Sequence, residues 1–98
     1  MKDIRITVLR RTVYEDLVEQ YGVPSSNTCP MELGKVFVCR DNRRPEGFCP
    51  GAWQSVGPFA AGLAEGGGYS GWMKDPQTAM ISCRDGFRPV SFLLETIE

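Results

Sequence analysis

The stretch that decides the fold is RPEGFCPGAW, residues 44–53. Pro45 and Gly47 suit the second and fourth positions of a type I turn. Pro50 suits the first position of a helix, where the N–H that proline lacks would have no partner. Cys49 is therefore predicted to be the N-cap of that helix, where the positive end of the helix dipole favours a thiolate.

The helix that starts at Pro50 is predicted to be amphipathic and to be interrupted near its middle. Its apolar positions follow a helical spacing, at Trp53, Val56, Ala60 and Leu63. Pro58 lies inside this pattern, and an internal proline removes one backbone hydrogen bond and clashes with the preceding turn. We therefore expect a kink or two short helices, ended by the glycines of residues 66–68.

The chain before this stretch predicts a strand and a first helix. Apolar and polar residues alternate over residues 4–8, which is typical of a strand with one buried face. Thr12 and Glu15 have the spacing of a capping box for a helix over residues 13–21. Gly22 is predicted to end that helix in the left-handed conformation.

The rest of the chain adds three strands. Residues 35–39 predict one strand, and residues 79–83 and 90–95 predict a hairpin around the turn Asp85-Gly86. The predicted fold class is α+β, a single domain over residues 1–98. Its element order is β-α-β-α-β-β, and it has a sheet of about four strands, two helices packed on one face and a C-terminal hairpin.

Composition excludes several classes of protein. The chain has 98 residues and a formal net charge of −1, which argues against non-specific nucleic-acid binding. No apolar run approaches the ~20 residues of a membrane span, and the charged N-terminus does not resemble a signal peptide. We therefore expect a cytoplasmic protein that contacts neither membrane nor nucleic acid. Histidine is absent, which excludes Ser-His-Asp and Cys-His catalysis and any zinc site with an imidazole ligand.

Several motifs occur together in a fixed order, and they carry a resemblance. They are Cys29-Pro30, Gly34-Lys35-Val36-Phe37-Val38, Pro45-Glu46-Gly47-Phe48-Cys49-Pro50 with Ala52-Trp53, and Cys83-Arg84-Asp85-Gly86-Phe87-Arg88-Pro89-Val90. Together they resemble a family of small bacterial and archaeal proteins of uncharacterised activity, with Cys-Pro motifs and a Cys-x-Asp-Gly-x-Arg-Pro-Val hairpin. The resemblance extends from the first strand to Leu94, although Lys35 replaces an acidic residue. It implies a small single-domain protein, and it assigns no catalytic role to any residue.

The four cysteines lack the C-x-x-C spacing of a zinc ribbon. Cys29, Cys49 and Cys83 lie at the predicted ends of elements, where their thiols can converge on a soft metal ion or form a disulfide. Cys39 lies within a predicted strand and is expected to be a small buried hydrophobic residue. The simplest alternative is that all four are reduced cysteines with roles in packing and loops.

Cys49 is also the candidate catalytic residue of a thiol-dependent redox protein or enzyme, with Cys29 or Cys83 as its second thiol. Gly66, Gly68 and Gly71 spell G-x-G-x-x-G, but the motif follows a helix rather than a strand, so a flexible loop is the better interpretation.

Trp72, Asp85 and Arg88 are the candidate binding residues. Trp72 in the glycine-rich loop is either a lid over the core or the anchor of an interface. Asp85 and Arg88 flank the hairpin turn, where a structural role is the simpler interpretation. The leading hypothesis is a small non-catalytic domain that binds a protein partner or forms a homo-oligomer. The alternatives are the thiol-dependent protein and the soft-metal protein, and no cofactor is indicated.

Overall fold

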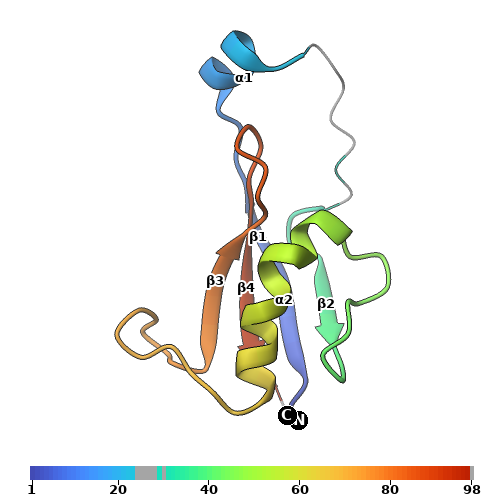
Figure 1. The fold of residues 1–98 in the computed structure, drawn as a ribbon, viewed down its shortest axis with the longest axis vertical. Helices are drawn as coiled ribbons and strands as arrows, with labels where there is room; N and C mark the ends of the chain where they lie inside the picture. The colour runs from blue at the N-terminus through green and yellow to red at the C-terminus, as the bar shows by residue number, and fades with distance from the viewer. Residues whose placement is uncertain (24–28, 30, 98) are drawn as a thin grey trace.

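The computed structural model describes residues 1–23, 29 and 31–97, and Pro30 of the first Cys-Pro motif lies outside this part. Its elements follow the predicted order, which confirms an α+β fold with a C-terminal hairpin (Figure 1). They are β1 (Ile4–Arg11), α1 (Glu15–Tyr21), β2 (Val36–Cys39), α2 (Pro50–Ala64), β3 (Thr78–Ser82) and β4 (Val90–Thr96). No helix within the described ranges is long and apolar enough to cross a bilayer.

The strands form one antiparallel sheet in the order β2-β1-β4-β3. The first and last strands of the chain therefore lie side by side in its centre. Ile6 pairs with Phe37 of β2 on one side and with Leu94 of β4 on the other. The register shifts between Val8 and Arg10, which makes a β-bulge at the end of β1.

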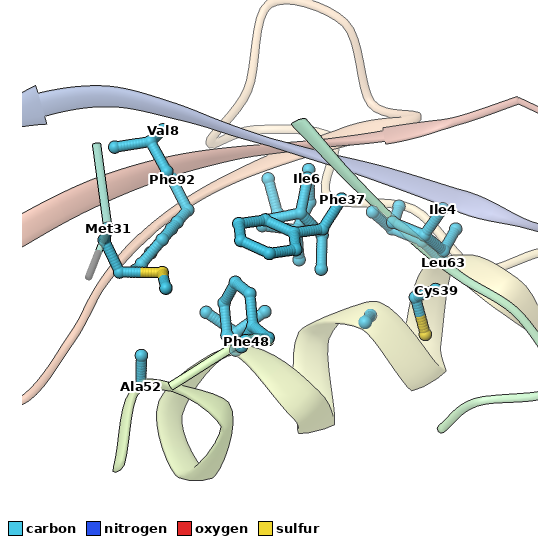
Figure 2. Packing of buried hydrophobic residues seen from close by; sticks show 14 of the residues in the cluster. Ile4, Ile6, Val8, Met31, Phe37, Cys39, Phe48, Ala52, Leu63 and Phe92 are labelled. Atoms are coloured by element: carbon cyan, nitrogen blue, oxygen red, sulfur yellow. The ribbon is translucent and has the colours of Figure 1, made fainter. Parts of the chain in front are cut away.

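One face of the sheet carries the core. Ile4, Ile6 and Val8 alternate with exposed or half-buried residues and are at most 1% exposed, as the period-2 pattern predicts. Phe48 lies at the centre of the aromatic contacts, with ring centroids 5.0 Å from Phe37 and 5.2 Å from Phe92. Figure 2 shows these side chains between the sheet and α2, together with Met31, Cys39, Ala52 and Leu63.

α2 begins at Pro50 with Cys49 as its N-cap, as predicted, and it covers this core face. Its buried side is formed by Ala52, Val56, Gly57, Ala60, Leu63 and Ala64. The helix continues through Pro58, so the predicted division into two short helices is wrong. Pro58 is exposed, so its ring and the carbonyl that lacks an N–H partner lie away from the packed face.

The turn before α2 lies one residue later than predicted. The Phe48 N–H donates to the Pro45 carbonyl at 3.1 Å, and Gly47 has φ +81°. A positive φ at the third position is typical of a type II turn, which corrects the predicted type I turn. The Arg44 side chain closes the stretch by donating to the Phe48 carbonyl at 2.6 Å.

α1 is the element that differs most from its prediction. It begins at Glu15 rather than Val13, its N-cap Tyr14 makes no side-chain capping bond, and none of its residues is buried. The Thr12 N–H instead donates to the Pro89 carbonyl, so the predicted capping box does not form. Gly22 has φ −84°, which is not left-handed. α1 lies beyond the end of the sheet, so α2 alone covers the face that both helices were expected to share (Figure 1).

Candidate functional site

A pocket of about 380 Å³ lies between the first turn of α2 and the hairpin tip that joins β3 to β4. Three of the four cysteines line it, and they come from three separate segments of the chain. The lining residues with reactive or charged side chains are Cys29, Cys49, Cys83, Arg84, Asp85 and Arg88. Five of these six are candidate site residues from the sequence, and the fold brings them to one place.

Cys49 reaches the pocket because it is the N-cap of α2. Its thiol makes no capping hydrogen bond with the helix within the described structure, and the residue is half-buried. Gly51 and Ala52 of the first helical turn line the same pocket. The backbone N–H groups of a first turn have no partner inside the helix, and the helix dipole adds positive potential there. The α2 end of the pocket therefore favours a negatively charged group.

Cys83 is held at the base of the hairpin loop. Its backbone N–H donates to the Val90 carbonyl at 3.0 Å, and the Val90 N–H donates to Cys83 Sγ at 3.3 Å. The thiol in turn faces the Arg88 carbonyl at 4.0 Å, the long limit for a hydrogen bond from sulfur. These contacts fix the position of the sulfur on the hairpin side of the pocket.

The hairpin loop supplies the charges. Asp85 Oδ1 accepts from the Phe87 N–H at 2.8 Å and from the Arg88 N–H at 3.2 Å, so this carboxylate shapes the turn. Arg84 and Arg88 form no ion pair with any residue in the described part of the chain. Two guanidinium groups and one carboxylate leave the loop side of the pocket with a net positive charge.

The metal hypothesis has less support. Among the described residues, no group of three or more His, Cys, Asp or Glu side chains is placed to hold a metal ion. The three cysteines line one pocket, but they are not arranged to coordinate a metal ion together.

Cys39, the fourth cysteine, is 1% exposed in the core, as expected, and burial raises the pKa of its thiol above the ordinary value of 9.0.

Trp72 does not belong to the pocket. Its ring lies 6.0 Å from that of Phe59 and 5.7 Å from that of Tyr69, measured between centroids. This aromatic group lies between α2 and the glycine-rich loop, and the Tyr69 N–H donates to the Pro76 carbonyl across that loop. Trp72 remains 53% exposed.

Arg84 is the functional candidate that the sequence analysis missed. Its neighbour Cys83 and the second arginine of the loop, Arg88, were both candidates from the sequence. The spacing R-x-x-x-R across the turn was the signal that could have indicated Arg84 as well.

No family model, curated protein or solved structure matches the chain. The resemblance to the small bacterial and archaeal family therefore remains a prediction, and the pocket has to be interpreted from its own chemistry.

Proposed function

We propose that this chain is a small thiol-dependent redox protein whose pocket exchanges disulfides with a small, negatively charged disulfide. The observation that carries the proposal is the convergence of Cys29, Cys49 and Cys83 beside Arg84 and Arg88 in one pocket. Of the three hypotheses from the sequence, the pocket favours this one, because a non-catalytic domain does not require thiols from three segments to meet next to unpaired cations.

Cys49 is the attacking thiol in this proposal. Its thiolate attacks one sulfur of a disulfide R–S–S–R, the bond between Cys49 and S–R forms as the original S–S bond breaks, and the released thiolate takes a proton from water. Cys83 then attacks the Cys49 sulfur and releases the second R–SH. The protein loses two electrons and two protons to R–S–S–R and retains a disulfide between Cys49 and Cys83, with Cys29 as the alternative second thiol.

The charges define the substrate class. Guanidinium groups bind carboxylates through directed, charge-assisted hydrogen bonds, so Arg84 and Arg88 favour a disulfide that carries carboxylates. Asp85 contributes indirectly, because its bonds to the Phe87 and Arg88 N–H groups hold the loop that presents both arginines. A catalytic cycle also requires a reducing environment that returns the thiols, and this is why we assign the protein to the cytoplasm.

The test compares a charged and a neutral disulfide on the reduced protein. The wild type and the variants Cys49→Ser, Cys83→Ser and Cys29→Ser are incubated with oxidised glutathione or with hydroxyethyl disulfide, and intact mass is followed over time. The mass of the wild type is expected to decrease by that of two hydrogen atoms, as a disulfide forms. Cys83→Ser is expected to accumulate the mixed disulfide on Cys49, and Cys49→Ser is expected to do neither.

The double variant Arg84→Ala/Arg88→Ala is the matched control for charge. It should slow the reaction with oxidised glutathione by roughly thirtyfold, because two guanidinium contacts worth about 1 kcal/mol each are lost, and it should leave the reaction with hydroxyethyl disulfide unaffected. Equal rates of disulfide exchange for the wild type and the three cysteine variants would refute the proposal. Thiols that become reactive only after addition of a chelator would instead support the soft-metal hypothesis.

A further inference from the structure

α1 presents an apolar stripe that nothing in the described chain covers. Tyr14 and Leu17 are 45% and 37% exposed, and Tyr21 is 75% exposed. These residues recur at i, i+3 and i+7, so they lie on one side of the helix, and the acidic residues Glu15 and Glu19 lie on the other. An isolated helix of seven residues is marginal in water, so a stable α1 needs a surface for this stripe.

The exposed apolar side chains of the described protein are concentrated in two places. Of the eleven large exposed hydrophobic residues, eight lie either on the segment around α1 or on the face of the sheet away from α2. They are Val13, Tyr14, Leu17, Tyr21 and Val23 in the first place, and Leu9, Val36 and Met80 in the second. Concentrated exposure of this kind marks an interaction surface, whereas single exposed residues do not.

The open face of the sheet contains a matching hollow. It has a volume of about 470 Å³ and is lined by Leu9, Arg10, Met80 and Ser91. Beside it, Met80 pairs with Leu93 of the neighbouring strand, and this pair extends the apolar surface toward the sheet centre. Leu9 alternates to the open face after the buried Val8, and the β-bulge then places Arg10 opposite Ser91, so both residues lie at the hollow.

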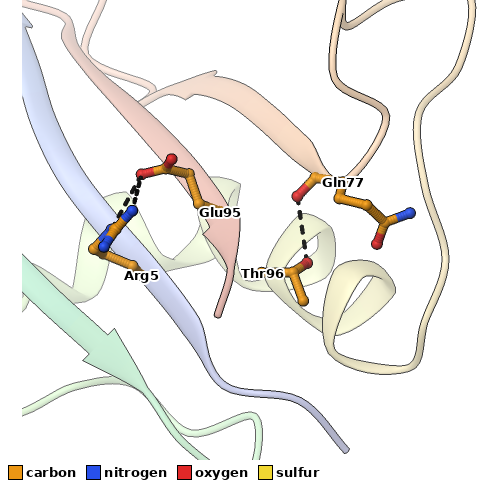
Figure 3. Close-up of polar contacts among 4 residues, drawn as sticks. All are labelled: Arg5, Gln77, Glu95 and Thr96. Carbon is orange, nitrogen blue, oxygen red and sulfur yellow. Dashed lines mark hydrogen bonds and ion pairs between the residues drawn. The ribbon is translucent and has the colours of Figure 1, made fainter. Parts of the chain in front are cut away.

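The charges of the two surfaces are opposite. The first turn of α1 is acidic and its last turn has no basic residue, so Glu15, Asp16 and Glu19 give the helix three negative charges. Arg10, which lines the hollow, forms no ion pair within the described residues. Arg5 on the same face is already neutralised by Glu95 at 3.1 Å (Figure 3), so the net positive charge is confined to the end of the sheet near the hollow.

α1 is held away from the hollow of its own chain. The Thr12 N–H donates to the Pro89 carbonyl at 2.9 Å, and the Tyr14 N–H donates to the Phe87 carbonyl at 2.8 Å. These bonds bind the start of the helix to the hairpin loop, and they place α1 beyond the end of the sheet (Figure 1). The stripe and the hollow are complementary, but within one chain these bonds keep them apart.

We propose that the occupant of the hollow is α1 of a second copy of this chain. In a two-fold dimer each copy supplies one helix and one hollow, so the contact is made twice. Leu17 and Tyr21 of one copy pack against Leu9 and Met80 of the other. The acidic side of the helix lies beside Arg10, which steers the two copies together and fixes their orientation.

Sedimentation of the full chain over a concentration series tests this dimer. The wild type is expected to be dimeric at about 0.1 mM, where even a complex of modest affinity forms. Leu17→Asp and Met80→Asp are each expected to give a monomer. Trp72→Ala is the matched control: it removes an aromatic residue that is also half exposed, but lies outside both surfaces, and the dimer should persist.

Charge-reversal variants test whether α1 of each copy contacts the hollow of the other copy. The helix variant Glu15→Lys/Asp16→Lys/Glu19→Lys and the hollow variant Arg10→Glu should each raise the dimer Kd by roughly tenfold or more, because like charges then face each other. Their equimolar mixture should form a heterodimer, because both of its contacts are again between opposite charges. Circular dichroism checks that each variant is folded.

Two results would overturn the proposal. One is a wild type that remains monomeric throughout the series. The other is a dimer that the substitutions at Met80 and Arg10 leave unchanged, which would mean that α1 contacts another surface or that the dimer uses another face.

Discussion

Phe48→Ala is expected to remove a large share of the free energy of unfolding. Phe48 is 1% exposed, and its ring meets three others, with centroids 5.0 Å from Phe37, 5.2 Å from Phe92 and 6.1 Å from Trp53. Truncation of a buried phenylalanine costs about 3–5 kcal/mol, and each aromatic pair adds ~0.5–1.5 kcal/mol beyond the area it buries. We expect the upper part of the first range, about 4–5 kcal/mol.

A loss of this size is measurable in two ways. A domain of this length has a total stability of about 5–15 kcal/mol, so the variant should be near its limit of folding. The melting temperature should fall by roughly 16–40 °C, since ~1 kcal/mol corresponds to about 4–8 °C in a domain of this size. Thermal and urea unfolding, followed by far-UV circular dichroism, give both quantities.

Phe59→Ala is the matched control. Its ring also meets two others, at 5.5 Å from Tyr69 and 6.0 Å from Trp72, but the residue is only partly buried. We expect it to cost less than about 2 kcal/mol, because a half-exposed site leaves no closed cavity. A loss below ~2 kcal/mol for Phe48→Ala, or equal losses for both variants, would refute the assignment of Phe48 as the centre of the core.

Three further predictions concern single residues. Burial raises the pKa of the Cys39 thiol above 9.0, so the stabilisation from keeping this thiol neutral is complete below pH 9.0. The free energy of unfolding should fall as the pH rises from 9.0 through the higher folded-state pKa. Chemical unfolding from pH 7 to 11 should show this decline, and Cys39→Ala should lack it. Pro58→Ala should raise the free energy of unfolding by about 1–2 kcal/mol, because the helix regains the backbone hydrogen bond that proline cannot make at this exposed position. A lower stability, measured by urea unfolding, would contradict the idea that Pro58 destabilises α2. Asp85→Ala should cost about 1 kcal/mol through two lost turn bonds and should slow the reaction with oxidised glutathione, while Asp85→Asn, which retains the accepting oxygen, should recover most of both.

Local sequence was sufficient to predict the elements whose ends are marked by proline, glycine or a turn motif. Pro50 after Cys49 located the start of α2, and the Asp85-Gly86 turn located the hairpin, because both depend on conformations that neighbouring residues impose. Strand alternation likewise predicted which side of β1 is buried. The order of the strands in the sheet was not predictable, since it depends on pairings between residues that are far apart in the sequence.

α1 shows where local reasoning fails. The apolar stripe of Leu17 and Tyr21 has helical spacing and predicts a helix, but it does not specify what surface receives the stripe. The capping-box pattern was overridden by the hairpin, whose Pro89 carbonyl takes the Thr12 N–H. The candidate site was also only partly predictable. The positions of the cysteines at the ends of elements followed from the sequence, but only the fold brings Cys83 and its neighbour Arg84 to the first turn of α2.

The central position of β1 beside β4 has a consequence for folding during synthesis. Ile4 pairs with Thr96, so the innermost ladder of the sheet joins residues from opposite ends of the sequence. At a translation rate of about 5–20 residues per second, β1 waits several seconds for its main partner after leaving the ribosome. Its three buried residues stay exposed during that interval, with only the short β2 available for pairing. The centre of the sheet therefore cannot form until β4 has emerged, and the nascent chain is most prone to misassociation just before that point.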